Sequence, residues 1–189
     1  MTMHQLKRNY LLAGLALWAT TAHAQNLLQN PEFDGGLTGW TVVGGTFVID
    51  ASDGSPAQPS LHATAAPPSG HEAIVNSPCI EMSAPQNVDL SANIKDVLGD
   101  GPEVDVYAFT DMACANFLNV VAIAAAPQDG AWHTSSQTSM ALPNGTQSVM
   151  VSIFTGSQLL GGSLDTHFDH IAFGPTGTTP VRLQSFDVE

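Results

Sequence analysis

The sequence predicts an all-β protein built as a two-sheet antiparallel β-sandwich. Beyond residue 40, short segments of alternating apolar and polar residues are separated by Gly, Pro, Asn and Asp, which is the pattern of half-buried strands joined by turns. No window has a sustained helical period, so we expect no helices in this region. Many short strands in a chain of single-domain length are typical of a sandwich.

The expected strands follow one another through the rest of the chain. The segment 88–95 alternates most clearly, with apolar side chains on one face and polar side chains on the other, and 104–109 does likewise. Pro78 indicates an edge or a bulge, because proline cannot donate to a strand ladder. The segment 40–50 reads as a strand pair or one bulged strand. The full set is 40–50, 60–66, 71–82, 88–95, 104–109, 117–126, 132–142, 148–154 and 167–173.

Residues 1–24 have the pattern of a secretory signal peptide. Lys7 and Arg8 precede a short apolar run at 11–19, and Ala22-His23-Ala24 forms a small-residue cleavage site. The apolar run is too short to span a bilayer, which takes about 20 residues. We therefore expect an exported protein, periplasmic or extracellular, with no insertion in the membrane.

The charge balance excludes two classes of partner. The chain carries a formal net charge of −13, and beyond residue 24 its only cations are Lys95 and Arg182. Such a surface repels phosphate backbones and anionic lipids. We expect no nucleic-acid partner, and the acidity fits either bound Ca²⁺ or simple solubility outside the cell.

The two cysteines, Cys79 and Cys114, are expected to form a disulfide. An even number of cysteines in a chain directed to an oxidising compartment favours a bridge over a catalytic thiol. In the chain-entropy model a loop of this length gains roughly 4 kcal/mol from closure.

Both ends of the domain resemble one family. The run NLLQNPEFDGGLTGW at 26–40 and the run HFDHIAFG at 167–174 resemble the opening and closing strands of galactose-binding-like jelly rolls. These are secreted bacterial carbohydrate-binding modules of the kind found in families 4, 9 and 22. The resemblance implies one jelly-roll module at 25–174, followed by a linker or tail at 175–189.

The resemblance also implies a structural calcium ion. Modules of this kind commonly tie the first loop to the last strand through Ca²⁺, and the matching positions here are Asp34 and Asp169, with Glu32 beside them. Calcium takes 6 to 8 oxygen ligands, so backbone carbonyls would complete the set. The alternative is that Asp34 only orders its own turn.

A sugar-binding groove is expected from the polar faces of two strands. Tyr107 and Asp105 lie opposite the apolar face of 104–109, and Asn93 and Lys95 lie opposite that of 88–95. If both faces line one concave sheet, these four residues form a groove with an aromatic stacking surface. The alternative is that all four are ordinary solvent-facing residues. Trp40 and Trp132 match framework positions of the family, so we expect both in the core.

No motif points to catalysis. HExxH and GxSxG are absent from the sequence, and residues three apart on a strand face opposite sides, so His167 and His170 should not share one ion. The sequence therefore predicts a secreted, monomeric, non-catalytic module that binds an extracellular polysaccharide or glycan. An extracellular structural or adhesion module is the first alternative. A small glycoside hydrolase that uses paired carboxylates is the second.

Overall fold

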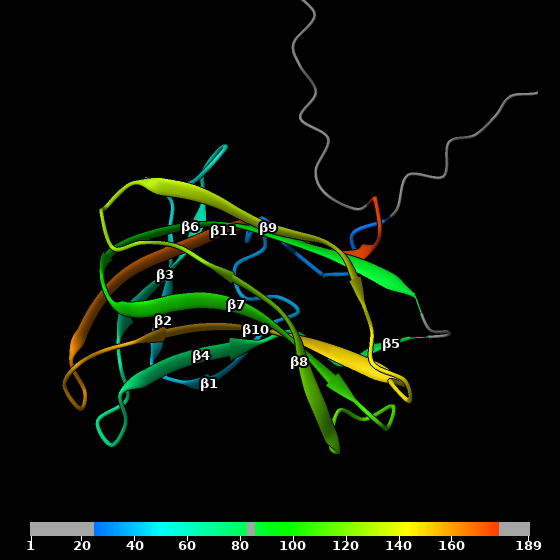
Figure 1. Cartoon of the computed structure of the whole chain (residues 1–189). Helices are drawn as coiled ribbons and strands as arrows, with labels where there is room; N and C mark the ends of the chain where they lie inside the picture. The colour runs from blue at the N-terminus through cyan, green and yellow to red at the C-terminus, as the bar shows by residue number, and fades with distance from the viewer. Residues whose placement is uncertain (1–24, 83–85, 178–189) are drawn as a thin grey trace, which may run out of the picture.

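Two antiparallel sheets packed face to face make up the protein (Figure 1). The computed structural model describes residues 25–82 and 86–177, and all its regular elements are strands. No helix among these residues has the length and apolarity needed to cross a bilayer. The predicted all-β, two-sheet jelly roll is confirmed, and each expected strand segment contains at least one strand.

Sheet A has the order β1-β4-β10-β7-β8, with β5 paired to β10, and sheet B has the order β2-β3-β11-β6-β9. The strands of sheet A are β1 (Thr41–Gly44), β4 (Glu72–Asn76), β5 (Ile80–Glu81), β7 (Asp100–Phe109), β8 (Phe117–Ala125) and β10 (Ser148–Gly156). Those of sheet B are β2 (Thr46–Asp50), β3 (Ser60–Ala65), β6 (Asn87–Leu98), β9 (Trp132–Ala141) and β11 (Ser163–Pro175). Consecutive strands β6 and β7 therefore lie in opposite sheets.

The segment 40–50 passes from one sheet to the other at Gly45. This residue has φ of +79°, and a Cβ there would lie 2.4 Å from Cβ of Ala73. Only glycine fits such a conformation at so close an approach. The segment is thus a strand pair divided between the two sheets.

The sandwich core follows the alternation of the strands. The apolar face of β6, formed by Val88, Leu90, Ala92 and Ile94, is fully buried. It meets the equivalent face of sheet A, which includes Val104, Val106, Val151 and Ile153. Trp40 is also buried in this core, with its ring centroid 5.6 Å from that of Phe33. Its predicted core position is confirmed.

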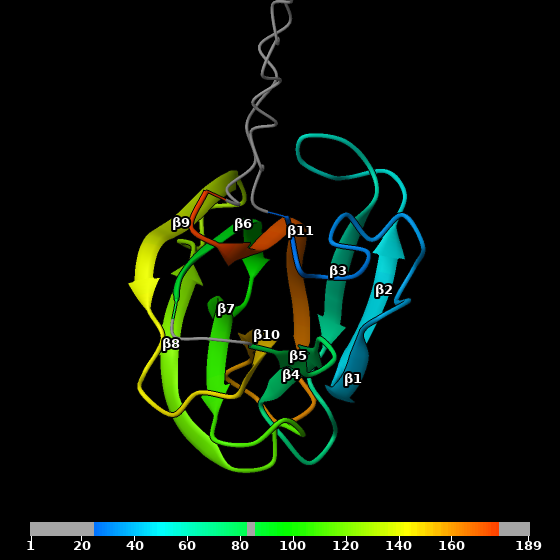
Figure 2. The ribbon, with the colours of Figure 1, turned by 90° about the vertical axis from the view of Figure 1, so that its right-hand side faces the viewer.

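The two ends of the module lie side by side. The backbone N–H of Leu27 donates to the carbonyl of Phe173 at 2.8 Å, and Asn26 Nδ2 donates to the carbonyl of Ile171 at 2.9 Å. Figure 2 shows this first segment beside β11. The predicted tail at 175–189 overlaps the last residue of β11, whereas residues 1–24 and 178–189 lie outside the described part.

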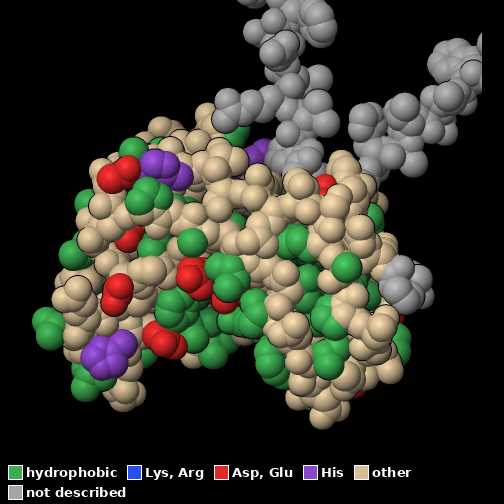
Figure 3. Space-filling model, in the orientation of Figure 1, with side chains coloured by type: hydrophobic (Ala, Val, Ile, Leu, Met, Phe, Trp, Pro, Cys, Tyr) green, Lys and Arg blue, Asp and Glu red, His purple; other side chains and the backbone are tan. Residues whose placement is uncertain are grey.

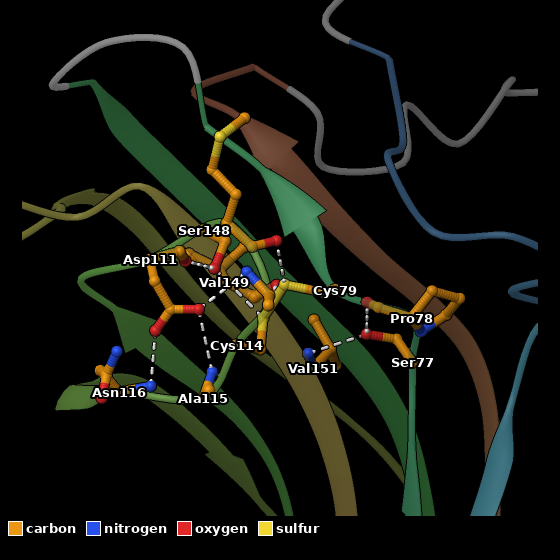
Figure 4. The surroundings of a disulfide bond; sticks show 12 residues. Ser77, Pro78, Cys79, Asp111, Cys114, Ala115, Asn116, Ser148, Val149 and Val151 are labelled. Carbon is orange, nitrogen blue, oxygen red and sulfur yellow. Dashed lines mark hydrogen bonds between the residues drawn. A yellow bond between two sulfur atoms is a disulfide. The ribbon is translucent and has the colours of Figure 1, made fainter.

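A disulfide joins Cys79 to Cys114, as predicted, with Cα atoms 5.7 Å apart (Figure 4). It connects the link between β4 and β5 to the loop after β7. Asp111 organises that loop, because its carboxylate accepts backbone N–H groups of Ala113, Ala115 and Asn116. Ser148 Oγ donates to the carbonyl of Asp111 at 2.5 Å, which fixes the loop against β10.

Candidate functional site

The four residues expected to line one groove are divided between two faces. Tyr107 and Asp105 belong to β7 in sheet A, whereas Asn93 and Lys95 belong to β6 in sheet B. Each pair points away from the core of its own sheet, so the two pairs face opposite sides of the sandwich. The predicted shared groove is wrong, because β6 and β7 are joined across the sandwich and not within one sheet.

The outer face of sheet B is covered by the loop 51–59. Asn93 Nδ2 donates to the carbonyl of Ser55 at 2.5 Å, and its Oδ1 accepts a hydrogen bond from Thr134 at 2.7 Å. Lys95 Nζ forms an ion pair with Asp53 at 2.6 Å. Only 3% of Asn93 is exposed. These side chains hold the loop and offer no open surface to a ligand.

Trp132 lies on this same outer face, so its predicted core position is wrong. It pairs directly with Lys95 across β6 and β9, and side chains of directly paired residues share a face. Its indole N–H donates to Asp53 Oδ1 at 3.0 Å, and its ring contacts His167 edge-on. The ring is half-buried and helps to anchor the loop.

The outer face of sheet A carries a row of polar side chains that crosses three strands. Asn76 on β4 pairs with Ser152 on β10, and Ser152 pairs with Asp105 on β7. Asn76, Ser152 and Asp105 are called the polar row below. Val75, Val151, Ile153, Val104 and Val106, their sequence neighbours, are all fully buried in the core. The alternation therefore directs the polar row outward.

Two buried acceptor atoms in the polar row have no hydrogen-bond partner among the residues that the structure describes. They are Oδ1 of Asn76 and Oδ1 of Asp105. The other oxygen of Asp105 accepts a hydrogen bond from Tyr107 Oη at 2.8 Å. Burial raises the pKa of Asp105, and burial together with Asp105, Glu103 and Glu72 raises that of Tyr107. Buried acceptors without partners cost stability, so a hydrogen-bond donor that reaches them would bind favourably. Both atoms lie just beneath the surface, so a ligand would reach them only after a neighbouring side chain moves.

Apolar side chains flank the polar row. On one side Met150 pairs with Tyr107, and Tyr107 pairs with Val120. The ring of Phe117 meets that of Tyr107 edge-on at 6.0 Å and is 59% exposed. On the other side Ile74, Phe154 and Glu103 form the next row. Figure 3 shows acidic and apolar side chains together on a hollowed part of the surface over these strands.

The three residues expected to ligate calcium do not converge within the described part of the chain. Asp34 is exposed at the tip of its turn, whereas Asp169 is buried and accepts backbone N–H groups of Ser55 and His170. Burial raises the pKa of Asp169 to about 7, and the charge of Glu32 adds to the shift. Glu32 and Asp169 are therefore near one another, and calcium binding by this pair with nearby carbonyls stays a prediction.

His167 and His170 do not share a site, as expected. His170 Nδ1 lies 2.6 Å from Glu32, whereas His167 stacks on His62 with ring centroids 4.0 Å apart. A separate hollow of about 620 Å³ lies at the loop ends and is lined by Leu98, Gly99, Gln128, Ser157, Gln158, Leu159, Gly162 and Ser163. It has no titratable lining residue and no exposed aromatic ring, so its chemistry is less specific than that of sheet A.

The fold can be compared with solved structures. A family 16 carbohydrate-binding module matches with a TM-score of 0.56 and 18% identity, covering 78% of this chain and 99% of that chain. A family 61 module solved with β-1,4-galactotriose matches with a TM-score of 0.54 and 11% identity, covering 80% and 99%. The chain shares its β-sandwich fold with these carbohydrate-binding modules. No family model and no curated protein matches the sequence.

The same fold also occurs within larger proteins. The enzymatically active domain of a tailspike protein from bacteriophage CBA120 matches the module with a TM-score of 0.61 and 13% identity. The match covers 79% of this chain but only 21% of the tailspike chain. The module thus spans about a fifth of that protein, and identities this low establish the fold alone.

Sequence reasoning found Tyr107 and Asp105 but missed their partners in the polar row. Ser152 lies in the alternating segment 148–154, so its outward direction was readable from the sequence. The position of β10 between β4 and β7 could not be predicted from the sequence, because strand order depends on long-range pairing. The place of Asn76 in the polar row could not be predicted for the same reason.

Proposed function

We propose that the module binds a polysaccharide on the outer face of sheet A and has no catalytic role. The observation that carries the proposal is the polar row with its two buried acceptors without partners, flanked by the rings of Tyr107 and Phe117. Sugars combine hydroxyl donors with apolar ring faces, so they suit a surface of this composition. A module of this fold solved in complex with β-1,4-galactotriose supports the proposal.

The charges on this face favour a neutral or amino-bearing glycan over an acidic one. Glu72, Glu103 and Asp105 all lie close enough to raise the pKa of Tyr107. Lys95, the one Lys or Arg in the described residues, is on the opposite sheet and is paired with Asp53. A polyuronate would therefore meet like charges without a compensating cation.

Affinity electrophoresis in gels containing soluble glucan, xylan, galactan, glycol chitosan or polygalacturonate tests the proposal. We expect retardation by at least one neutral or amino-bearing polymer and none by polygalacturonate. Tyr107→Ala should weaken binding about 5-fold to 150-fold, since loss of one stacking ring costs about 1–3 kcal/mol by analogy with base stacking. Lys95→Ala, on the covered face, should bind like the wild type.

Each other outcome contradicts a named part of the proposal. Loss of binding in Lys95→Ala with retention in Tyr107→Ala would transfer the site to sheet B. If no polymer retards the protein, the result would favour the hypothesis of an adhesion module. The exposed apolar residues Phe117, Val120 and Ile123 would then supply a protein-binding surface. Release of reducing sugar would favour the hydrolase reading.

A further inference from the structure

A cluster on the outer face of sheet B is independent of the polysaccharide face. His62 on β3 and His167 on β11 are direct cross-strand partners, and their rings stack nearly parallel. Asp165 lies two residues before His167 on β11, so its side chain shares that face. Three potential ligand groups thus come together from two neighbouring strands.

One carboxylate oxygen lies against both imidazoles. Oδ1 of Asp165 is 3.0 Å from His62 Nε2 and 3.1 Å from His167 Nε2. His62 Nε2 is buried and makes no aligned hydrogen bond, despite the short distance to that oxygen. The same oxygen accepts a hydrogen bond from His167 Nε2, so an ion that binds between these groups replaces the proton they share.

The opposite nitrogen of His167 has the partners that commonly support a metal-bound histidine. Its Nδ1 lies 3.2 Å from Ser60 Oγ and 3.9 Å from a carboxylate oxygen of Asp50. A hydroxyl or carboxylate on the second ring nitrogen orients a ligating imidazole.

We propose that His62, Asp165 and His167 form a site for a divalent transition-metal ion of the zinc class. Zinc binds imidazole nitrogen and carboxylate oxygen at about 2.0–2.2 Å, in a tetrahedral arrangement that water completes in open sites. The side chain of Asp165 is 42% exposed and that of His62 is 20% exposed, so an ion can enter from solvent. Binding requires the two rings to tilt from their parallel stack. Asp50 and Asp53 add negative charge nearby.

Isothermal titration of the metal-free full chain with ZnCl₂ tests this site. We expect one Zn²⁺ per chain and a higher melting temperature with zinc, because an ion that binds only the folded state stabilises it. His62→Ala and Asp165→Asn should each weaken zinc binding at least tenfold. His133→Ala is the matched control: His133 is partly exposed, lies on β9 and pairs with Asp129 outside the cluster.

The readouts separate a specific site from loss of folding. Circular dichroism should show folded protein for both cluster variants, and the imidazole NMR signals of His62 and His167 should shift with zinc while that of His71 does not. Wild-type protein without a stoichiometric zinc site would overturn the proposal. So would equal zinc affinity in wild type, His62→Ala and Asp165→Asn, or loss of zinc binding only in His133→Ala.

Discussion

The outer faces of the two sheets have similar residues but opposite roles. On sheet B, Asn93 and Lys95 are satisfied by the loop 51–59, which covers them. On sheet A, no loop within residues 25–82 and 86–177 supplies a partner to Oδ1 of Asn76 or of Asp105. The difference teaches that a polar strand face becomes a candidate binding surface only where the chain leaves its hydrogen-bonding capacity unused.

Opening the disulfide should produce the largest effect, and it should act on the sheet A side. The Cys79→Ser, Cys114→Ser double variant should lose roughly 4 kcal/mol of unfolding free energy, since the bridge closes a separation of 35 residues. Urea unfolding measures the loss. Hydrogen exchange should accelerate around 77–82 and 110–116 before it does in the loop 51–59. Equal acceleration on both faces would contradict this assignment.

Calcium, if it binds at Glu32 and Asp169, should stabilise the sheet B end. A ligand at a hundredfold excess over its Kd adds about 2.7 kcal/mol. Addition of CaCl₂ to the metal-free protein should therefore raise the melting temperature of the wild type, and the melt of Asp169→Ala should be insensitive to added calcium. A wild-type melt that calcium does not change would leave Asp169 as a structural acceptor for Ser55 and His170 only.

Asn93→Ala should release the loop 51–59. We expect a loss of about 1–3 kcal/mol, because the variant leaves the carbonyl of Ser55 without its donor at the buried face. Asn119→Ala, at an exposed position on β8, is the matched control. Thermal melts of both variants measure the difference. A polysaccharide affinity that falls in Asn93→Ala would argue against separate roles for the two faces.

Asp105→Asn should have the smallest effect, and it should stabilise the protein at neutral pH. Because burial raises the pKa of Asp105 in the folded state, the folded protein holds this proton more firmly than the unfolded chain. The free energy of unfolding should therefore fall as the pH rises from the pKa of Asp105 in the unfolded chain through its pKa in the folded protein. The variant lacks this fall and should gain about 1 kcal/mol at pH 7, with weaker polysaccharide binding.

Melting curves from pH 3 to pH 8 measure the difference between Asp105→Asn and the wild type. Asp34→Asn, exposed in the turn at 34–39, is the control and should retain the fall in stability that is assigned to Asp105. A wild type whose stability rises with pH in this interval, with a slope that Asp105→Asn removes, would reverse the assigned sign.

Local patterns in the sequence were sufficient for the strands, the core and the disulfide. The alternation in 88–95 correctly placed Val88 and Ile94 in the core, because one buried face fixes the period of a strand. The candidate sites could not be predicted in this way, because they depend on contacts between segments that are distant in the sequence. Trp132 and Asn93 depend on how the loop 51–59 folds back, and the cluster at His62 depends on its pairing with a strand about one hundred residues later. Neither contact leaves a periodic signal.

The meeting of Leu27 with Phe173 has a consequence for engineering the chain. Since the first and last segments of the module are hydrogen-bonded to each other, a short covalent linker could join them, and new termini could be opened at Gly99, which links β6 to β7 between the exposed residues Leu98 and Asp100. Such a circular permutant would retain every strand pair of both sheets, because β6 and β7 belong to opposite sheets. It would also let a reporter or a second module be fused at the edge opposite the original ends.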